Sequence, residues 1–217
     1  MTVLPAVPAE ARQVTVGPAR LARWIDGFAD RHGAIDTASD GKQVVLVGSD
    51  ESTAWIEVPF PPLHIEGGRT LTSLQTHVVR DRRVGVLLVR RGGYAAGVFM
   101  GRKLISSKVG SGYVQGGTKA GGWSQQRFAR RRENQARAAF GAAADVAARI
   151  LLPEVASLEV VVCGGDRAAV DAVLADPRLK GVAAKVAAPW LAVPDPRLKV
   201  LQATPEGFLA VRIAVYP

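Results

Sequence analysis

The chain has 217 residues, of which 48% are hydrophobic and 22% are charged. These values are typical of globular proteins, so they exclude a chain that is disordered throughout and allow one large domain or two small ones. The formal net charge of +9, from 28 basic and 19 acidic residues, favours a polyanionic partner such as nucleic acid or a membrane surface.

The first 75 residues predict a small N-terminal α/β subdomain with loose first residues. Residues 1–14 contain two prolines and no clear hydrophobic period. The stretches KQVVLVGSD and STAWIEVPF predict two strands joined as a hairpin through GSDE, and PFPPL (59–63) predicts a linker or domain edge. Between the loose start and the hairpin, an amphipathic helix is expected from apolar residues at i, i+3, i+4 and i+7: Leu21, Trp24, Ile25 and Phe28.

Residues 76–217 predict a second domain with a mixed sheet. The runs RVGVLLVRR and YAAGVFM flank Gly92-Gly93, which is a hairpin signal, and LISSKVGSGYV is a candidate third strand. The stretch LEVVVCGGDRAAVDAVL predicts a strand, a tight turn and a helix with Asp166 as its N-cap. KVAAPWLAV fits either a helix or a strand, and one or two strands are expected at the C-terminal end. Strands mixed with helices in this order predict an α/β fold.

One long helix is predicted over residues 124–152, because no proline occurs between Ser124 and Pro153 and alanine is frequent. Its first turns are rich in arginine and its last turns are apolar. We therefore expect its rear to pack on the sheet and its front to project into solvent or a partner. The predicted apolar stripe consists of Phe128, Gln135, Ala139, Ala142, Val146 and Ile150.

A glycine loop (residues 115–126) precedes this helix and lies within a strongly basic segment. The loop matches neither a P-loop nor a dinucleotide-binding fingerprint. From 101 to 137 the only acidic residue is Glu133, so the segment carries a net charge of +8 and the rest of the chain is nearly neutral. A flexible connector and a solvated helix face are the simpler interpretations, but a phosphate backbone is the natural counter-charge. The basic residues are Arg102, Lys103, Lys108, Lys119, Arg127, Arg130, Arg131, Arg132 and Arg137.

Other chemistry is poorly represented in the sequence. The single cysteine, Cys163, excludes an intrachain disulfide and lies in an apolar run typical of a buried thiol. Three scattered histidines give no zinc spacing, so we expect neither a metal nor a cofactor. The chain has no signal-peptide pattern and no apolar run of membrane-spanning length, so we expect a cytoplasmic protein that does not bind membranes.

The stretch GGWSQQRFARRRENQARAAFGAAADVA resembles the middle domain of eukaryotic and archaeal class-1 peptide-chain release factors. In that family a Gly-Gly-Gln loop is followed by Ser and by a helix containing R-F-A-R, which here is residues 127–130. The resemblance covers residues 78–217. It implies an RNase H-like release-factor middle domain with a mixed sheet, preceded here by the small α/β subdomain.

The loop departs from the family pattern at the catalytic position. Trp123 follows Gly121-Gly122 where the family has glutamine, whereas Gln125 and Gln126 come later and Gln115 comes earlier. A longer loop with a displaced glutamine is similar to the Vms-like release factors, and to their actinobacterial group in particular. The eukaryotic members of that branch are implicated in ribosome quality control, in which they free nascent chains from tRNA on stalled large subunits.

The resemblance implies a ribosome-associated peptidyl-tRNA hydrolase whose partners are the large subunit, rRNA and peptidyl-tRNA. Gln125 is the first choice for positioning water against the peptidyl ester, and Gln126 and Gln115 are the alternatives. The reaction could be hydrolysis of the ester or a cut within the tRNA tail. Two other functions remain open: a non-catalytic RNA-binding protein, and a protein-interaction module whose basic helix binds an acidic partner. We expect a monomer. The loop glycines that allow a close backbone approach are Gly116, Gly117, Gly121 and Gly122. The residues expected to contact RNA are Lys119, Trp123, Arg127, Arg130, Arg131 and Arg132.

Overall fold

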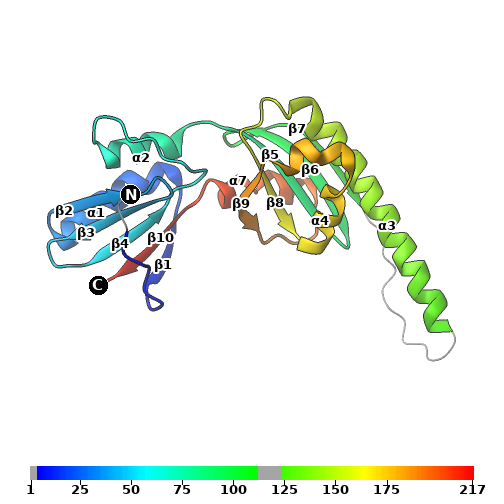
Figure 1. Ribbon diagram of the computed structural model, residues 1–217, viewed down its shortest axis with the longest axis horizontal. Helices are drawn as coiled ribbons and strands as arrows, with labels where there is room; N and C mark the ends of the chain where they lie inside the picture. Colours follow the sequence, from blue (N-terminus) through cyan, green and yellow to red (C-terminus); the bar gives the residue numbers. More distant parts are fainter. Residues whose placement is uncertain (1–3, 112–123) are drawn as a thin grey trace. The chain divides into compact units, whose positions relative to one another are not determined.

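A computed structural model describes residues 4–111 and 124–217, which form two compact units (Figure 1). The first unit contains Met1–Arg80 together with Glu206–Pro217, and the second contains Asp81–Pro205. Each unit has one five-stranded sheet.

The sheet of the first unit is antiparallel, with the strand order β1-β10-β4-β3-β2. The predicted hairpin is confirmed as the pair β3 and β4. Two helices, α1 (Leu21–His32) and α2 (Thr70–Val79), pack against this sheet. The strands are β1 (Arg12–Val16), β2 (Ile35–Ser39), β3 (Gln43–Gly48), β4 (Thr53–Glu57) and β10 (Val211–Tyr216).

Helix α1 follows the predicted amphipathic spacing. Leu21, Ile25 and Phe28 are buried in the core, and Trp24 is half-buried with its ring stacked on that of Phe28. The helix ends at Gly33, whose φ of 78° is unfavourable for other residues and whose N–H donates to the Ala29 carbonyl oxygen at 2.8 Å. The apolar period therefore fixes which side of α1 packs on the sheet.

The chain returns to the first sheet at its C-terminal end, which corrects the expectation that residues 76–217 form one continuous domain. Strand β10 lies between β1 and β4, and it pairs with both. Strand β1 is also a correction, because it begins inside the segment expected to be loose. Its sequence signal is weak since an edge strand buries few of its side chains; only Val16 of this strand is buried.

The second sheet is mixed, with the order β7-β6-β5-β8-β9. Strand β6 runs antiparallel to β5 and β7, whereas β8 runs parallel to β5 and β9. This order and these directions are those of an RNase H-like fold, as the family resemblance implied. The strands are β5 (Arg83–Arg90), β6 (Gly93–Met100), β7 (Lys103–Ser111), β8 (Val160–Gly165) and β9 (Val186–Leu191).

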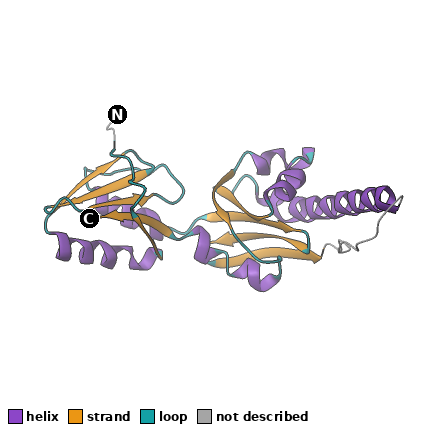
Figure 2. Ribbon diagram, turned by 90° about the horizontal axis from the view of Figure 1, so that it is seen from below, coloured by secondary structure: helices purple, strands orange, loops and turns teal. Residues whose placement is uncertain are grey.

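Helices cover both faces of this second sheet (Figure 2). One face carries α3 (Ser124–Leu151) and α4 (Arg167–Leu174), and the opposite face carries α6 (Leu198–Gln202). The core on the α3 face joins strand residues such as Leu87 and Val161 to alanines of α3. Two further short helices are α5 (Lys180–Ala183) and α7 (Pro205–Phe208). In the described parts of the chain, no helix combines the length and the apolar character needed to cross a bilayer.

Candidate functional site

The candidate site divides into a loop and a helix, of which the structure describes the helix. Gln115, Lys119 and Trp123 lie outside the described residues, as do the four loop glycines (Gly116, Gly117, Gly121 and Gly122). Gln125 and Gln126, which the predicted loop included, belong to the first turn of α3. The backbone of the helix therefore carries two of the three candidate glutamines, Gln125 and Gln126.

The predicted RNA-binding arginines lie along the next turns of α3. Positions 127, 130 and 131 are related by three and four residues, so they fall on one side of the helix. At about 100° per residue, position 126 lies on the same side as 130, whereas position 125 lies on the side of 132. Arg132 is the fourth predicted arginine of this stretch. The helical backbone thus places positions 127, 130 and 131 on one side of α3 and position 132 on another, and it separates positions 125 and 126 by about 100°.

The N-terminal half of α3 extends past the sheet edge at which β7 ends (Figures 1 and 2). The helix has 28 residues, so it is about 42 Å long. Its rear half is held by apolar packing, and the predicted stripe is wrong in phase. Val146 and Ile150 are only half-buried. The buried residues are Ala143, Ala144, Ala147 and Leu151.

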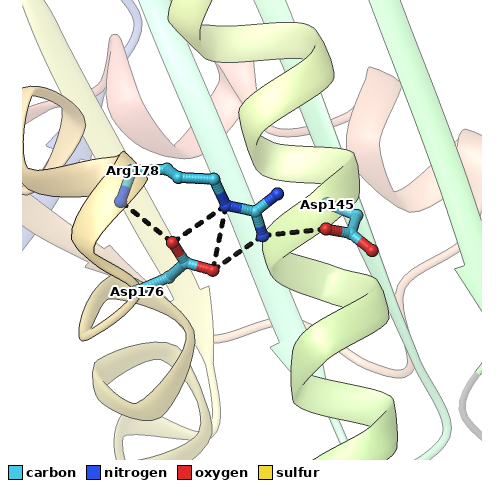
Figure 3. A network of polar contacts seen from close by, with 3 residues as sticks. All are labelled: Asp145, Asp176 and Arg178. Atoms are coloured by element: carbon cyan, nitrogen blue, oxygen red, sulfur yellow. Dashed lines mark hydrogen bonds and ion pairs between the residues drawn. The ribbon is translucent and has the colours of Figure 1, made fainter.

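An ion-pair network also ties the rear half of α3 to the neighbouring 3-10 turn Pro177–Leu179 (Figure 3). Arg178 donates through one terminal nitrogen to Asp145 Oδ1 at 2.8 Å and to Asp176 Oδ2 at 2.7 Å. Its Nε donates to Asp176 Oδ1 at 3.0 Å. The Arg178 side chain lowers the pKa of Asp176, and the Arg178 backbone N–H adds to this effect. Arg178 therefore links two segments that are 33 residues apart.

Sequence reasoning missed Arg178 because its partner Asp145 lies on a different element. The only local signal is Asp176, whose carboxylate also accepts the Arg178 backbone N–H at 2.9 Å. The strand-turn-helix interpretation around Asp166 is confirmed, since its side chain accepts from Ala169 N at 3.4 Å as the N-cap of α4.

The loop begins at a tightly packed corner of the second sheet. Ser111, the last residue of β7, pairs with Gly93 at the start of β6. Next to it, the ring of Tyr94 crosses Gly110, where an added Cβ would lie 2.3 Å from ring carbons. Gly110 therefore accommodates Tyr94 at the pair next to the last one before the loop.

Among the described residues, neither a cysteine nucleophile nor a cluster of metal ligands is observed. Cys163 is 1% exposed, and burial raises its pKa to about 12, with a smaller contribution from Asp171. Two of the three histidine rings have structural partners, since His32 Nδ1 lies 2.9 Å from Asp50 Oδ2 and His77 Nε2 lies 2.8 Å from the Pro59 carbonyl oxygen. Among residues 4–111 and 124–217, no three His, Cys, Asp or Glu side chains are grouped as metal ligands.

Several solved structures are similar to this chain, and it spans less than two thirds of the length of each of the following three. An archaeal translation termination factor, aRF1, is 14% identical to this chain with a TM-score of 0.41. The match covers 87% of this chain and 61% of aRF1. A second archaeal protein is 15% identical with a TM-score of 0.40, covering 90% and 64%. Dom34 of S. cerevisiae, a translation termination-like factor involved in RNA quality control pathways and interacting with Hbs1, is 8% identical with a TM-score of 0.34, covering 90% and 64%.

The sequence comparisons place the chain more narrowly. No curated protein sequence matches it. The family model for the actinobacteria/chloroflexi VLRF1 release factor matches residues 82–214, which is more than half of the chain. This range contains the entire second sheet, the glycine loop and α3. The chain therefore belongs to the actinobacteria/chloroflexi VLRF1 release factor family.

Proposed function

We propose that this protein is a ribosome-associated peptidyl-tRNA hydrolase of release-factor type that frees nascent chains from stalled ribosomes. A member of a release-factor family has a role in translation termination or rescue. The observation that carries the finer proposal is helix α3. Its rear half is buried on the sheet, while its front half extends beyond the sheet with the glycine loop directly before it.

The proposed reaction is hydrolysis of the ester that joins the peptide to the tRNA 3′ end. A glutamine amide positions a water molecule, whose oxygen attacks the ester carbonyl carbon. The bond to the tRNA oxygen then breaks, and that oxygen takes up a proton from the attacking water. Gln125 is the first candidate for this amide, with Gln126 and Gln115 as alternatives. Positioned donors of this kind act on the developing oxyanion and need no titrating side chain.

The proposed partners are the large ribosomal subunit, its rRNA and peptidyl-tRNA. A cytoplasmic monomer without membrane contact fits this role. The loop glycines allow a close approach to the tRNA end, and the adjacent basic residues neutralise phosphates. The residues proposed for RNA contact are Lys119, Trp123, Arg127, Arg130, Arg131 and Arg132.

A peptide-release assay on stalled large-subunit complexes tests the proposal. The wild-type protein should release labelled peptide, and Ala at the acting glutamine should lower the rate by about 100- to 1,000-fold. Gln125→Ala, Gln126→Ala and Gln115→Ala are measured separately. Gln202→Ala is the control because Gln202 is exposed on α6, on the other face of the sheet. Full release by all three loop-side variants would eliminate the glutamine mechanism.

Two further outcomes separate the alternatives. Analysis of the tRNA product distinguishes ester hydrolysis, which leaves an intact 3′ end, from a cut within the tRNA tail. Ribosome co-sedimentation without peptide release would favour the non-catalytic RNA-binding protein. Absence of co-sedimentation would favour an acidic protein partner.

A further inference from the structure

Four exposed arginines lie at one edge of the second sheet, beyond the basic helix. Strands β5, β7, β8 and β9 all end at this edge, because β6 is the only antiparallel strand. The chain also leaves for the glycine loop here, after Ser111. We call these four residues the arginine edge: Arg90, Arg91, Arg167 and Arg197.

The contacts around Arg90 connect the arginine edge to the start of the loop. Arg90 donates to the Val193 carbonyl oxygen at 2.8 Å, and its Nε lies 3.7 Å from Asp195 Oδ1. Asp195 in turn packs against Gly92, where an added Cβ would lie 2.6 Å from the carboxylate. The segment 193–197 therefore crosses the β5–β6 turn, beside the Gly93–Ser111 pair at which the loop begins.

A second set of contacts extends the arginine edge from Arg90 to Arg167. An added Cβ at Gly165 would lie 2.9 Å from Arg90 Cγ, so the two residues are adjacent. The Gly165 carbonyl oxygen accepts a hydrogen bond from Trp190 Nε1 at 3.2 Å. The guanidinium of Arg167 lies over the Trp190 ring, 4.3 Å from its centroid. These contacts form one continuous surface from the loop start to α4.

The charge of this surface is incompletely balanced. Asp166 caps α4 and Asp195 faces Arg90, so both acidic groups at the edge already have partners. Within the described residues, Arg91, Arg167 and Arg197 form no ion pair. Stacking on Trp190 restricts the Arg167 side chain and leaves its N–H donors in the guanidinium plane. Such a fixed, unpaired guanidinium is suited to bidentate contact with a phosphate.

We propose that the arginine edge is a second binding surface for RNA phosphates, in addition to the basic first half of α3. This proposal depends on the proposed function in one respect, namely that the polyanion bound by the arginine edge is RNA. The position supports RNA over other polyanions, since the arginine half of α3 extends past the same edge. A substrate that reaches the loop would thus meet basic groups from α3 and from the sheet.

Binding of labelled, deacylated tRNA by the full chain at several salt concentrations tests this proposal. Arg91→Gln with Arg167→Gln should reduce the slope of log affinity against log salt by about 1.4–1.8, at about 0.7–0.9 per lost phosphate contact. Both residues are exposed, so the variant should remain folded, with only a small fall in melting temperature from loss of the Arg167–Trp190 stacking. The control pair, Arg149→Gln with Lys180→Gln, removes the same charge from exposed sites on α3 and α5.

The outcomes are distinct from those of the release assay. Equal slopes for the two pairs, or no tRNA binding by the wild-type protein, would overturn the proposal. A reduced slope only in the Arg91/Arg167 variant supports it, even if no peptide is ever released. Absence of release together with this slope change would contradict the proposed hydrolase and leave the RNA-binding surface standing.

Discussion

Cys163 illustrates how burial removes a reactive group from the chemistry of the second unit. The thiol lies in β8 between the sheet and the helices, and its pKa of about 12 keeps it protonated at neutral pH. A thiol is nucleophilic as the thiolate, and each unit of pKa reduces the thiolate fraction about tenfold. Cys163 therefore packs as a small apolar side chain.

The native protein should react with a thiol reagent at pH 8 far more slowly than the urea-unfolded protein, by at least about a thousandfold, given an ordinary pKa of 9.0. Absorbance of the released reagent product measures both rates. Cys163→Ala provides the unreactive control, and it should retain peptide release. Stoichiometric labelling of the native protein within seconds would contradict the assignment of a buried thiol.

The sequence predicted single residues well where their partners are local. Cys163 in an apolar run and Asp166 at a helix start needed only their neighbours to be interpreted. The pairs Arg178–Asp145 and Arg167–Trp190 were beyond prediction, because each joins segments that come together only when the sheet forms. No motif marks such pairs, since neither partner alone carries a signal for the other.

At the scale of elements, α3 combines a closely packed rear with an extended front. Ala143 and Ala147 are buried in the core between α3 and the sheet. Because their side chains are single methyl groups, the helix packs closely on the sheet at these positions. Gly141, two residues before the first of them, is exposed, and a Cβ added there would meet nothing within 4 Å. The exposed and the buried side of this part of α3 should therefore respond oppositely to added side-chain atoms.

Gly141→Ala should raise the free energy of unfolding by about 0.5–1 kcal/mol, because glycine costs more backbone entropy than alanine in a helix. Ala147→Leu should lower it by about 1–3 kcal/mol through overpacking. Urea denaturation followed by circular dichroism measures both. If Ala147→Leu proved neutral, the packing of α3 on this sheet would have to be wrong.

Arg178→Ala should release the rear of α3 from the 3-10 turn and lower the urea midpoint at pH 7. The folded-state pKa of Asp176 is depressed below 3.8, so its contribution is present above that value and is lost as pH falls through the folded pKa. The difference between wild type and variant should therefore shrink in acid. Arg149→Ala, an exposed site on the same helix, is the control; an equal shift from it would argue against the network.

The elements themselves were largely predictable, whereas their phase and partners were not. Glycine turns and apolar runs identified the β3–β4 and β5–β6 hairpins, and the absence of proline identified α3. The stripe on α3 was misassigned because most of its rear residues are alanine, so several phases fit equally well. The glutamine positions of the candidate site followed from the family resemblance alone, since no periodicity selects a water-positioning amide.

For the molecule as a whole, the main departure from expectation is the path of the chain. It passes from the first unit to the second and returns after Pro205. Strand β10 then occupies an inner position of the first sheet, with Val211 and Ile213 in its core. Sequence patterns predict a strand there, but they do not reveal which of two sheets it joins.

A chain shortened to end at Pro205 should lose the fold of the first unit and keep that of the second. Removing β10 deprives β1 of its partner and removes three buried side chains, those of Val211, Ile213 and Ala214. Hydrogen exchange should then be fast across β3 and β4 but slow across β5 and β8. Persisting protection in β3 and β4 would show that the remaining strands suffice.

The inner position of β10 also bears on the order in which the units mature during synthesis. Residues 211–216 are made after every residue of the second unit, so the first sheet stays incomplete until then. The second unit can fold before β10 is made, and during that time β4 of the first unit lacks its β10 partner. The first unit, although most of it is synthesised first, therefore completes its folding last. This delay occurs in a protein that is itself proposed to act on ribosomes carrying unfinished chains.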